Sequence, residues 1–516
     1  MFDKLGNLGG MFGQKDEGHP LASARGLKKV IDEIPRDNAF RALDEVVGWL
    51  ESLRGANDFP AERLFETVRQ LDEVAQPHLR RLAREYLNTA RLTRSDEKRL
   101  WTINHGFWLQ LAEAYESCLK ILAQKNKAAE LVKQSLPMLA ARLINALSEL
   151  IKWEQFHYGP SPELVWKRMG QALLIAEEHD VAAKPVPSLG GRPGMTSPQA
   201  EYIRAVAFQA ASMDSLLPLE IELAERLIEH FLGSFVFTAV AQADSVYWVD
   251  LVLAEAPQRL ARMPSEARPT QRFFKPAGAQ AQFKALLTEL ERGGELPPDI
   301  SLGGQFASRV LIPVLQHLVA YLAPVPPQRS HDRHRVKHRI SVLNGLINAF
   351  VVFSSEFGGR PTGLQIESWV VENVSRGGFG ALVGSIPGEW MKVGVLLAMQ
   401  PEGGDNWLLG IVRRYHRESG TEAKVGIQTL ATKAIAVECR PRTASSYGAA
   451  ATLPALLIEE ANLPGEVRMV LPANSFDLRE SLEYQIDNRR FLLTPVAQVE
   501  QTLDYEVARY RQTADN

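Results

Sequence analysis

Apolar residues recur at helical spacing through most of the first 320 residues. In the segment 38–53, Phe40, Leu43, Val46 and Leu50 fall on one face of a helix. The same period predicts helices at 60–87, 94–125, 127–153, 161–178, 199–213, 217–233, 278–293 and 303–322. We therefore expect a mostly α-helical region over residues 21–322, built as a bundle or as helical hairpins and preceded by a flexible tail at 1–20.

Two of these helices share a spacing that is typical of tetratricopeptide repeats. The pattern W-x2-L-[GA]-x2-Y fits Trp108, Leu111, Ala112 and Tyr115, and Trp166, Met169, Gly170 and Leu173 echo it. The copies lie 58 residues apart, whereas the repeat is about 34 residues long. A repeat array and an irregular bundle both stay open. Within the helical region, the Pro- and Gly-rich stretch 184–198 predicts a loop, and 245–253 is a possible strand.

The pattern changes after Leu322. A Pro-rich linker at 323–334 runs into a basic segment, and from there apolar residues alternate with a period near two. Predicted strands cover 340–344, 346–353, 365–371, 381–383, 393–399, 407–415 and 424–430. Short strands with Gly-bearing turns predict a small β-barrel at 335–440.

A β-rich C-terminal extension is expected at 441–516. It holds possible strands at 455–459, 467–471 and 491–495 and a closing strand or helix at 498–512. These runs are too few for an independent core, so we expect the extension to pack against the barrel or the helical region. The predicted fold class is therefore multidomain α plus β.

Composition narrows the class of protein. The chain of 516 residues has a formal net charge of -3, so no overall basic field attracts DNA or anionic lipid. Cys118 and Cys439 are too few for a disulfide framework or a structural zinc site and read as buried thiols. Residues 1–20 lack a signal-peptide core, and no apolar run reaches the length of a membrane span. We expect a cytoplasmic protein without membrane insertion.

Two short motifs carry candidate chemistry. Arg335 and Arg339 form an R-x3-R pair at the lip of the first strand, where a flexible linker could fold them over an anion. Asn373, Ser375 and Gly378 form an [DN]-x-S-x2-G turn between two predicted strands. A guanidinium group can bind phosphate or the N7/O6 edge of guanine with two hydrogen bonds. A glycine lets the backbone approach a ligand closely.

Together, and in this order, the motifs make residues 330–440 resemble the PilZ domain family. A W-x2-G-x-V-R pattern from Trp407 to Arg413 adds to the resemblance. The resemblance implies a small β-barrel that binds cyclic di-GMP, with Arg335 and Arg339 gripping guanine and phosphate and with Asn373, Ser375 and Gly378 lining the barrel face. Arg333 and His334 are possible accessory residues. Such receptors act in motility, adhesion and biofilm control.

Other chemistries find little support in the sequence. His334 and His338 stand four apart, but the pattern around them is linker and strand rather than helix, so no metal site is predicted. No nucleotide-hydrolase, hydrolase or metalloprotease motif appears, and we predict neither catalysis nor a cofactor. The prediction is a cyclic di-GMP receptor whose helical region contacts an unidentified protein partner. The alternatives are a degenerate barrel that serves only protein–protein contacts, and an unassigned enzyme in the helical region.

Overall fold

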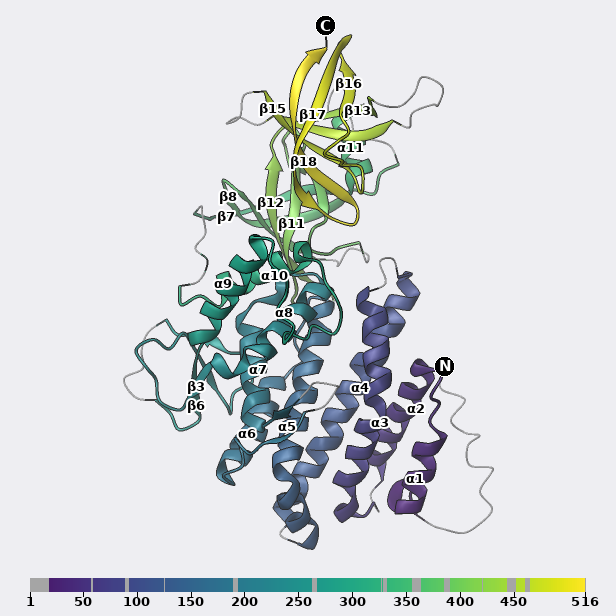
Figure 1. Cartoon of the computed structure of the whole chain (residues 1–516), viewed down its shortest axis with the longest axis vertical. Helices are drawn as coiled ribbons and strands as arrows, with labels where there is room; N and C mark the ends of the chain where they lie inside the picture. Colours follow the sequence, from purple (N-terminus) through teal and green to yellow (C-terminus); the bar gives the residue numbers. More distant parts are fainter. Residues whose placement is uncertain are drawn as a thin grey trace. The chain divides into compact units, whose positions relative to one another are not determined.

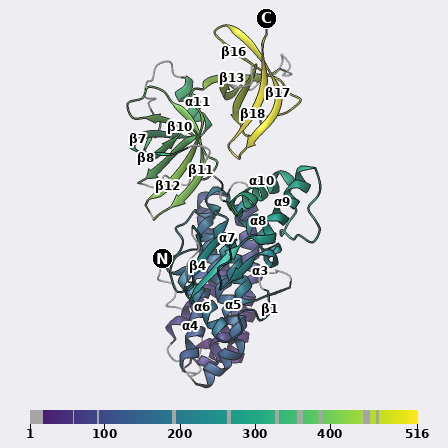
Figure 2. The ribbon, with the colours of Figure 1, turned by 90° about the vertical axis from the view of Figure 1, so that its left-hand side faces the viewer.

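A computed structural model describes most of the chain. The described ranges are 18–56, 59–88, 92–124, 126–188, 194–261, 267–325, 327, 332–354, 363–384, 390–419, 421–442, 452–459 and 465–515. Most of the predicted tail, five residues of the predicted linker, and the segment 355–362 lie outside these ranges. The fold is mixed α plus β, as predicted, with helices in the N-terminal part and two closed barrels in the C-terminal part (Figures 1 and 2).

The chain divides into two compact units. The first contains residues 1–156, 161–211 and 218–326, and the second contains 157–160, 212–217 and 327–516. Two short segments from within the helical part of the sequence therefore belong to the second unit. No helix among the described residues has the length and apolar character that a membrane span requires.

The first unit is a helical bundle with two small sheets. Its helices are α1 (Ala24–Glu33), α2 (Ala39–Gly55), α3 (Ala61–Asn88), α4 (Arg94–Lys120), α5 (Lys127–Phe156), α6 (Val165–Glu178), α7 (Pro198–Ala210), α8 (Pro218–His230), α9 (Ala277–Glu291) and α10 (Ser308–Tyr321). Side-chain caps define several starts: the Asn38 side chain accepts from the amide of Arg41, and Ser197 caps α7 ahead of a proline at its first position. Such caps satisfy backbone donors that the helix leaves unpaired.

Helix α5 is the centre of this unit. It is buried along most of its length and packs against α3, α4, α6, α7 and α8. Four short strands, β3 (Val236–Thr238), β4 (Tyr247–Asp250), β5 (Gln258–Arg259) and β6 (Gln271–Lys275), form a sheet in the order β3-β6-β4-β5. The strand predicted near 245–253 is β4. A two-stranded hairpin, β1 (Val186–Pro187) with β2 (Met195–Thr196), occupies part of the predicted loop at 184–198.

The two tryptophan motifs have different surroundings. A Cβ at Gly170 would lie 2.0 Å from the carbonyl oxygen of Leu251. Glycine at this position therefore allows the backbone that follows β4 to pack closely against α6. In the other motif, the Tyr115 hydroxyl donates to Asp72 of α3 over 2.6 Å. The shared spacing therefore does not produce equivalent helical hairpins, and the unit is an irregular bundle.

The first barrel is closed and entirely antiparallel. Its strands are β7 (His334–Asn344), β8 (Glu367–Ser375), β9 (Gly378–Val383), β10 (Leu396–Pro401), β11 (Leu408–Arg417) and β12 (Ala423–Ala431), in the order β10-β11-β12-β9-β8-β7, with β7 closing onto β10. The predicted strand at 346–353 is wrong, because this stretch is helix α11 (Leu346–Ser354). Leu346, Ala349 and Val352 are buried at helical spacing, and the remaining residues are so apolar that sequence alone did not separate the two periods.

The predicted C-terminal extension is a second closed barrel. Its strands are β13 (Ile435–Pro441), β14 (Leu453–Glu459), β15 (Glu466–Pro472), β16 (Leu482–Ile486), β17 (Arg489–Gln501) and β18 (Tyr505–Asp515), in the order β13-β14-β15-β18-β17-β16, with β16 pairing back to β13. Strand β13, assigned from sequence to the end of the first barrel, belongs to this one. Cys439, Met469, Leu493 and Tyr510 belong to its own core, so the expectation that the stretch lacks a core is wrong.

The two barrels share a third apolar cluster. Residues of β10, β11 and α11 pack there with residues of β14, β15 and β18, including Leu456, Val470 and Val507. Arg413 of β11 donates two hydrogen bonds, of 2.8 and 2.7 Å, to the carboxylate of Glu500 on β17. The C-terminal stretch therefore packs against the first barrel, as the sequence predicts, but as a second barrel. Cys439 lies inside it, and burial raises the pKa of this thiol to about 12.

The two short segments that the helical part of the sequence contributes to the second unit, 157–160 and 212–217, both contact β11. Tyr158 is buried in the core of the first barrel, its ring 5.1 Å from that of Tyr415, and its carbonyl accepts from the amide of Arg417 over 2.8 Å. The segment 212–217 contains the 3-10 turn η4 (Met213–Ser215), which packs along β11. The chain thus leaves helix α5, inserts one side chain into the barrel, and returns to the helical unit.

Candidate functional site

Both predicted motifs lie on adjoining strands of the first barrel. Arg335 and Arg339 are on β7, Asn373 and Ser375 are on β8, and Gly378 opens β9. The arginines were expected on a flexible linker, but the structure places both inside a strand that pairs with β8. Their backbones are therefore fixed, and only their side chains can move toward a ligand.

Alternation along the strands assigns the motif residues to the outer face. The side chains of Trp369, Val371, Ala381 and Val383 fill the barrel interior. Residues out of phase with them point outward, as in any pleated sheet. The strand pairing shifts register near Glu372, with respect to both β7 and β9, so that Asn373 turns outward together with Arg335.

A continuous row of paired residues crosses this face. Arg335 is paired with Asn373, Asn373 with Gly380, Gly380 with Gly426, and Gly426 with Arg414 on β11. A Cβ at Gly380 would lie 2.6 Å from the Asn373 side-chain amide, and a Cβ at Gly426 would lie 3.2 Å from the Cβ of Arg414. The Asn373 side chain therefore lies over Gly380, and the stem of Arg414 lies beside Gly426.

The serine and glycine of the turn form the neighbouring row. Ser375 is paired with Gly378, which is paired with Gln428 of β12. The Ser375 hydroxyl donates to the Gly378 carbonyl over 3.3 Å. A Cβ at Gly378 would lie 2.0 Å from the carbonyl oxygen of Ile427, so any side chain there would push β12 away. The glycine of the motif is thus required first by strand packing.

Arg339 begins the row on the other side. It is paired with Val370, and the row continues through Leu382, Lys424 and His416. Four residues along a strand separate Arg339 from Arg335, a distance of about 13 Å. The five residues named from sequence therefore occupy three neighbouring rows of one outward face.

The charges on this face differ in how they are paired. Arg413 donates to Glu500 and to Gln428, and Lys424 lies 3.0 Å from Glu418. Arg335 and Arg339 are both exposed and make no side-chain hydrogen bond or ion pair with the rest of the described chain. They are available for an incoming anion at little cost.

Asn373 holds a hydrogen-bond acceptor that has no partner among the described residues. This atom, the side-chain oxygen Oδ1, is buried. A buried acceptor without a partner is costly unless a ligand or water supplies a donor. The site thus offers two exposed guanidinium groups and one unsatisfied amide oxygen.

The two residues predicted as accessory, Arg333 and His334, lie at the start of β7. His334 is exposed and opens β7, and Arg333 directly precedes it. His338 is half-buried and pairs with the inward Val371, so it faces away from the motif. His331 lies outside the described residues. Over the described ranges, no three His, Cys, Asp or Glu side chains gather as metal ligands.

Sequence reasoning missed three residues of this face. Gly380, Gly426 and Arg414 complete the row that Arg335 and Asn373 begin. Alternation from Ala381 and Val425 would have placed the glycines outward. The strand pairing itself, β9 with β12 rather than with β10, could not be read from the order of the strands.

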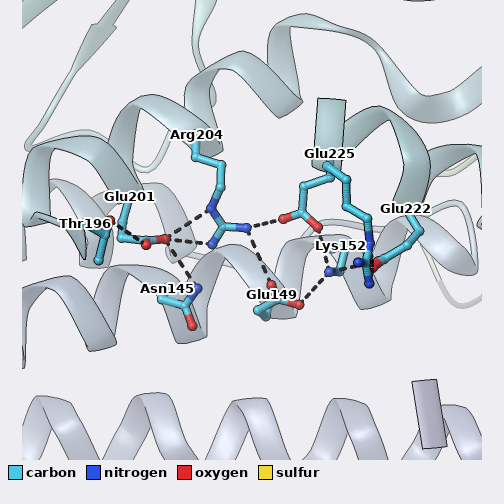
Figure 3. A network of polar contacts seen from close by, with 9 residues as sticks. Asn145, Glu149, Lys152, Thr196, Glu201, Arg204, Glu222 and Glu225 are labelled. Atoms are coloured by element: carbon cyan, nitrogen blue, oxygen red, sulfur yellow. Dashed lines mark hydrogen bonds and ion pairs between the residues drawn. The ribbon is translucent and has the colours of Figure 1, made fainter. Parts of the chain in front are cut away.

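The helical unit contains a second polar cluster, which is buried (Figure 3). Lys152 of α5 lies 2.7, 3.1 and 2.6 Å from Glu149, Glu222 and Glu225. Arg204 of α7 bonds Glu201 and also pairs with Glu225. A cavity of about 620 Å³ adjoins this cluster. Because each of these carboxylates has at least one cationic partner, the arrangement is that of a structural ion-pair network.

Comparison with known families concerns the helical unit. Residues 25–242 match the model of a family described as the N-terminal domain of the cyclic-di-GMP receptor FimW. The match runs from the first turn of α1 to just beyond β3 and leaves both barrels outside it. The family is described as a receptor, not as an enzyme. No curated protein matches the chain.

Proposed function

We propose that the protein is a receptor for cyclic di-GMP, that its first barrel is PilZ-like, and that the ligand binds on the outer face formed by β7, β8 and β9. The observation that carries the proposal is the register of Arg335 opposite Asn373 and of Asn373 over Gly380. This register collects both motifs on one face. The family match of the helical unit supports the same ligand.

Each group on the face fits one part of the ligand. Cyclic di-GMP carries two phosphates and two guanines, and a guanidinium group can bind either a phosphate or the N7/O6 edge of guanine with two bonds. Arg335 and Arg339 take these contacts. The unpartnered Oδ1 of Asn373 accepts a hydrogen bond from a guanine N–H group. Gly380 leaves room for the Asn373 side chain, which lies over it.

The helical unit is the effector part of this proposal. It has its own core around α5, and the match to the receptor's N-terminal domain covers mainly this unit, with the segments 157–160 and 212–217 of the second unit included. We assign to it the contact with a protein partner. Binding of the ligand would then be read out by helices and not by a catalytic centre.

Calorimetric titration of cyclic di-GMP into the full chain tests the proposal. Arg335→Ala and Arg339→Ala should each weaken binding about 10- to 150-fold, the range for a lost hydrogen bond to a charged group. Lysine at either position should restore only part of the affinity, because an ammonium cannot make the two-pronged contact. Raised salt should weaken binding modestly.

Arg440→Ala is the matched control, since Arg440 is an exposed strand arginine of the second barrel. It should leave the affinity unchanged. Absence of binding by the wild type at high micromolar ligand would favour a barrel that serves only protein–protein contacts. If both alanine variants bind with the affinity of the wild type, the ligand does not bind on this face.

A further inference from the structure

Two apolar side chains stand on the outer face of the first barrel, next to the candidate site. Val370 of β8 is paired with Leu382 of β9. Their chain neighbours Val371 and Ala381 belong to the barrel interior, so alternation turns Val370 and Leu382 outward. Both are half-buried, and among the described residues neither packs into an apolar cluster of the two barrels.

The other outward positions on these two strands are small or polar. On β8 they are Ser368, Asn373 and Ser375, and on β9 they are Gly378 and Gly380. A sheet with one face toward water normally carries polar side chains on that face. The apolar pair is an exception here, and covering it with an apolar part of a ligand is favourable.

The groups around the pair favour a flat, uncharged part of a ligand. Arg339 is paired with Val370, so its guanidinium group can reach the edge of a molecule that lies over the pair. Glu372 is an exposed carboxylate at the register shift between Val370 and Asn373, and it disfavours a phosphate at this point. The Oδ1 of Asn373 lacks a donor. Guanine is uncharged, with acceptors on its N7/O6 edge and N–H donors elsewhere, and it meets each of these conditions.

The spacing of these groups matches a single base. Paired residues on neighbouring strands lie about 5 Å apart, so Arg339, Val370 and Leu382 together span about 10 Å. Along β9, Gly380 and Leu382 lie about 7 Å apart, and the Asn373 side chain lies over Gly380. A base over the pair therefore has Arg339 at one edge and the Asn373 amide at another. It does not cross the Asn373 side chain, and it involves no strand beyond β9.

We propose that Val370 and Leu382 form the surface on which one guanine base of cyclic di-GMP packs, with Arg339 at the N7/O6 edge of that base. The inference rests on the proposed function and adds the residues that hold the base to those that hold charge. Neither residue belongs to the two sequence motifs. Both contribute to binding through the apolar area that the base buries, and not through a hydrogen bond or a charge.

Calorimetric titration of cyclic di-GMP into the full chain and its variants tests this surface. Leu382→Ala should weaken binding about 4- to 15-fold, because each buried CH₂ group contributes about fourfold to an affinity. Leu382→Met keeps an apolar side chain of similar length and should bind like the wild type. Leu492→Ala is the matched control and should also bind like the wild type. Leu492 is a half-buried leucine of β17 that faces outward, since its neighbour Leu493 lies in the core of the second barrel.

The heat-capacity change of binding separates packing of the base from an indirect structural effect. Burial of apolar surface makes this quantity negative. Measured by calorimetry over several temperatures, it should be less negative in Leu382→Ala than in the wild type. Arg335→Ala should leave it unchanged, because this variant removes a charged contact.

The possible failures are distinguishable. Unchanged affinity and heat-capacity change in Leu382→Ala, with Arg335→Ala still impaired, would overturn this inference and leave the proposed function standing. Equal losses of affinity in Leu382→Ala and Leu382→Met, with an unchanged heat-capacity change, would assign Leu382 a structural role and overturn the inference as well. Absence of binding by the wild type would instead refute the proposed function, and the inference with it.

Discussion

Replacing Lys152 with methionine should destabilise the helical unit strongly. The ammonium of Lys152 is the shared partner of Glu149, Glu222 and Glu225, and its side chain is only 8% exposed. Methionine has a similar length and volume, so the change leaves little cavity and mainly removes the charge. Three buried carboxylates then lose a common counter-charge.

The magnitude follows from breaking a buried ion pair, which costs about 3–5 kcal/mol. Arg226 still lies 2.7 Å from Glu222, and Arg204 still contacts Glu225, so part of the negative charge stays compensated. We therefore expect a loss near about 3 kcal/mol, the lower end of that range. For a unit of about 300 residues the loss corresponds to a fall in Tm of about 4–5 °C.

The loss should depend on pH in a predictable direction. In the wild type, burial acts to raise the pKa of Glu222, but Lys152 and Arg226 outweigh it and the pKa is lowered. A lowered pKa stabilises the fold above the ordinary carboxyl range and loses this effect only at more acid pH. Without Lys152, burial should raise the carboxyl pKa values, and the variant should then lose stability as pH rises from about 5 to 8.

Thermal melting followed by circular dichroism at the helical band reports this unit, because the barrels contribute little there. Lys284→Met is the matched control: Lys284 is exposed on α9, and a surface change of this kind alters stability by about 0.5 kcal/mol at most. A Tm of Lys152→Met within about 2 °C of wild type at pH 7.5 would contradict the reasoning. So would a fall in Tm that is equal at pH 5 and pH 8.

Three further outcomes concern the barrels. Gly378→Ala should lower the stability of the first barrel, because the new Cβ would lie 2.0 Å from the Ile427 carbonyl oxygen. If the variant and the wild type melt at the same temperature, β12 moves away from the new Cβ at no cost in stability. Arg413→Ala should cost about 1 kcal/mol by loss of its two bonds to Glu500, without a large change in ligand affinity, and a tenfold loss of affinity would place Arg413 in the site instead. Truncation after Pro441 should expose the apolar cluster shared by the barrels and reduce solubility, whereas a soluble monomer of unchanged stability would refute that packing.

The sequence predicted most of the helices and most strands of the first barrel because their apolar periods are regular. It failed at 346–353, where nearly every residue is apolar and a buried helix cannot be told from a buried strand. It also failed at β13 and β16, whose burial is completed by distant strands of the second barrel, and it left the stretch that forms β18 open between strand and helix. Closure of a barrel is a long-range property that local patterns do not carry.

The candidate face could be predicted only in part. The spacing of Arg335 with Arg339, and of Asn373 with Gly378, is visible in the sequence. Their placement on one face depends on the register shifts around Glu372 and on the pairing of β9 with β12. The apolar pair of Val370 and Leu382 is likewise set by the register of β8 against β9.

Hydrogen exchange of the full chain, with and without cyclic di-GMP, tests the central claim most directly. The family match covers mainly the helical unit, whereas the candidate face lies on the first barrel, so the location of the ligand is the decisive question. The account predicts slower exchange in peptides covering 334–344, 367–383 and 423–428 when ligand is bound. Protection confined to the helices that line the cavity of about 620 Å³, with the barrel peptides unchanged, would contradict it.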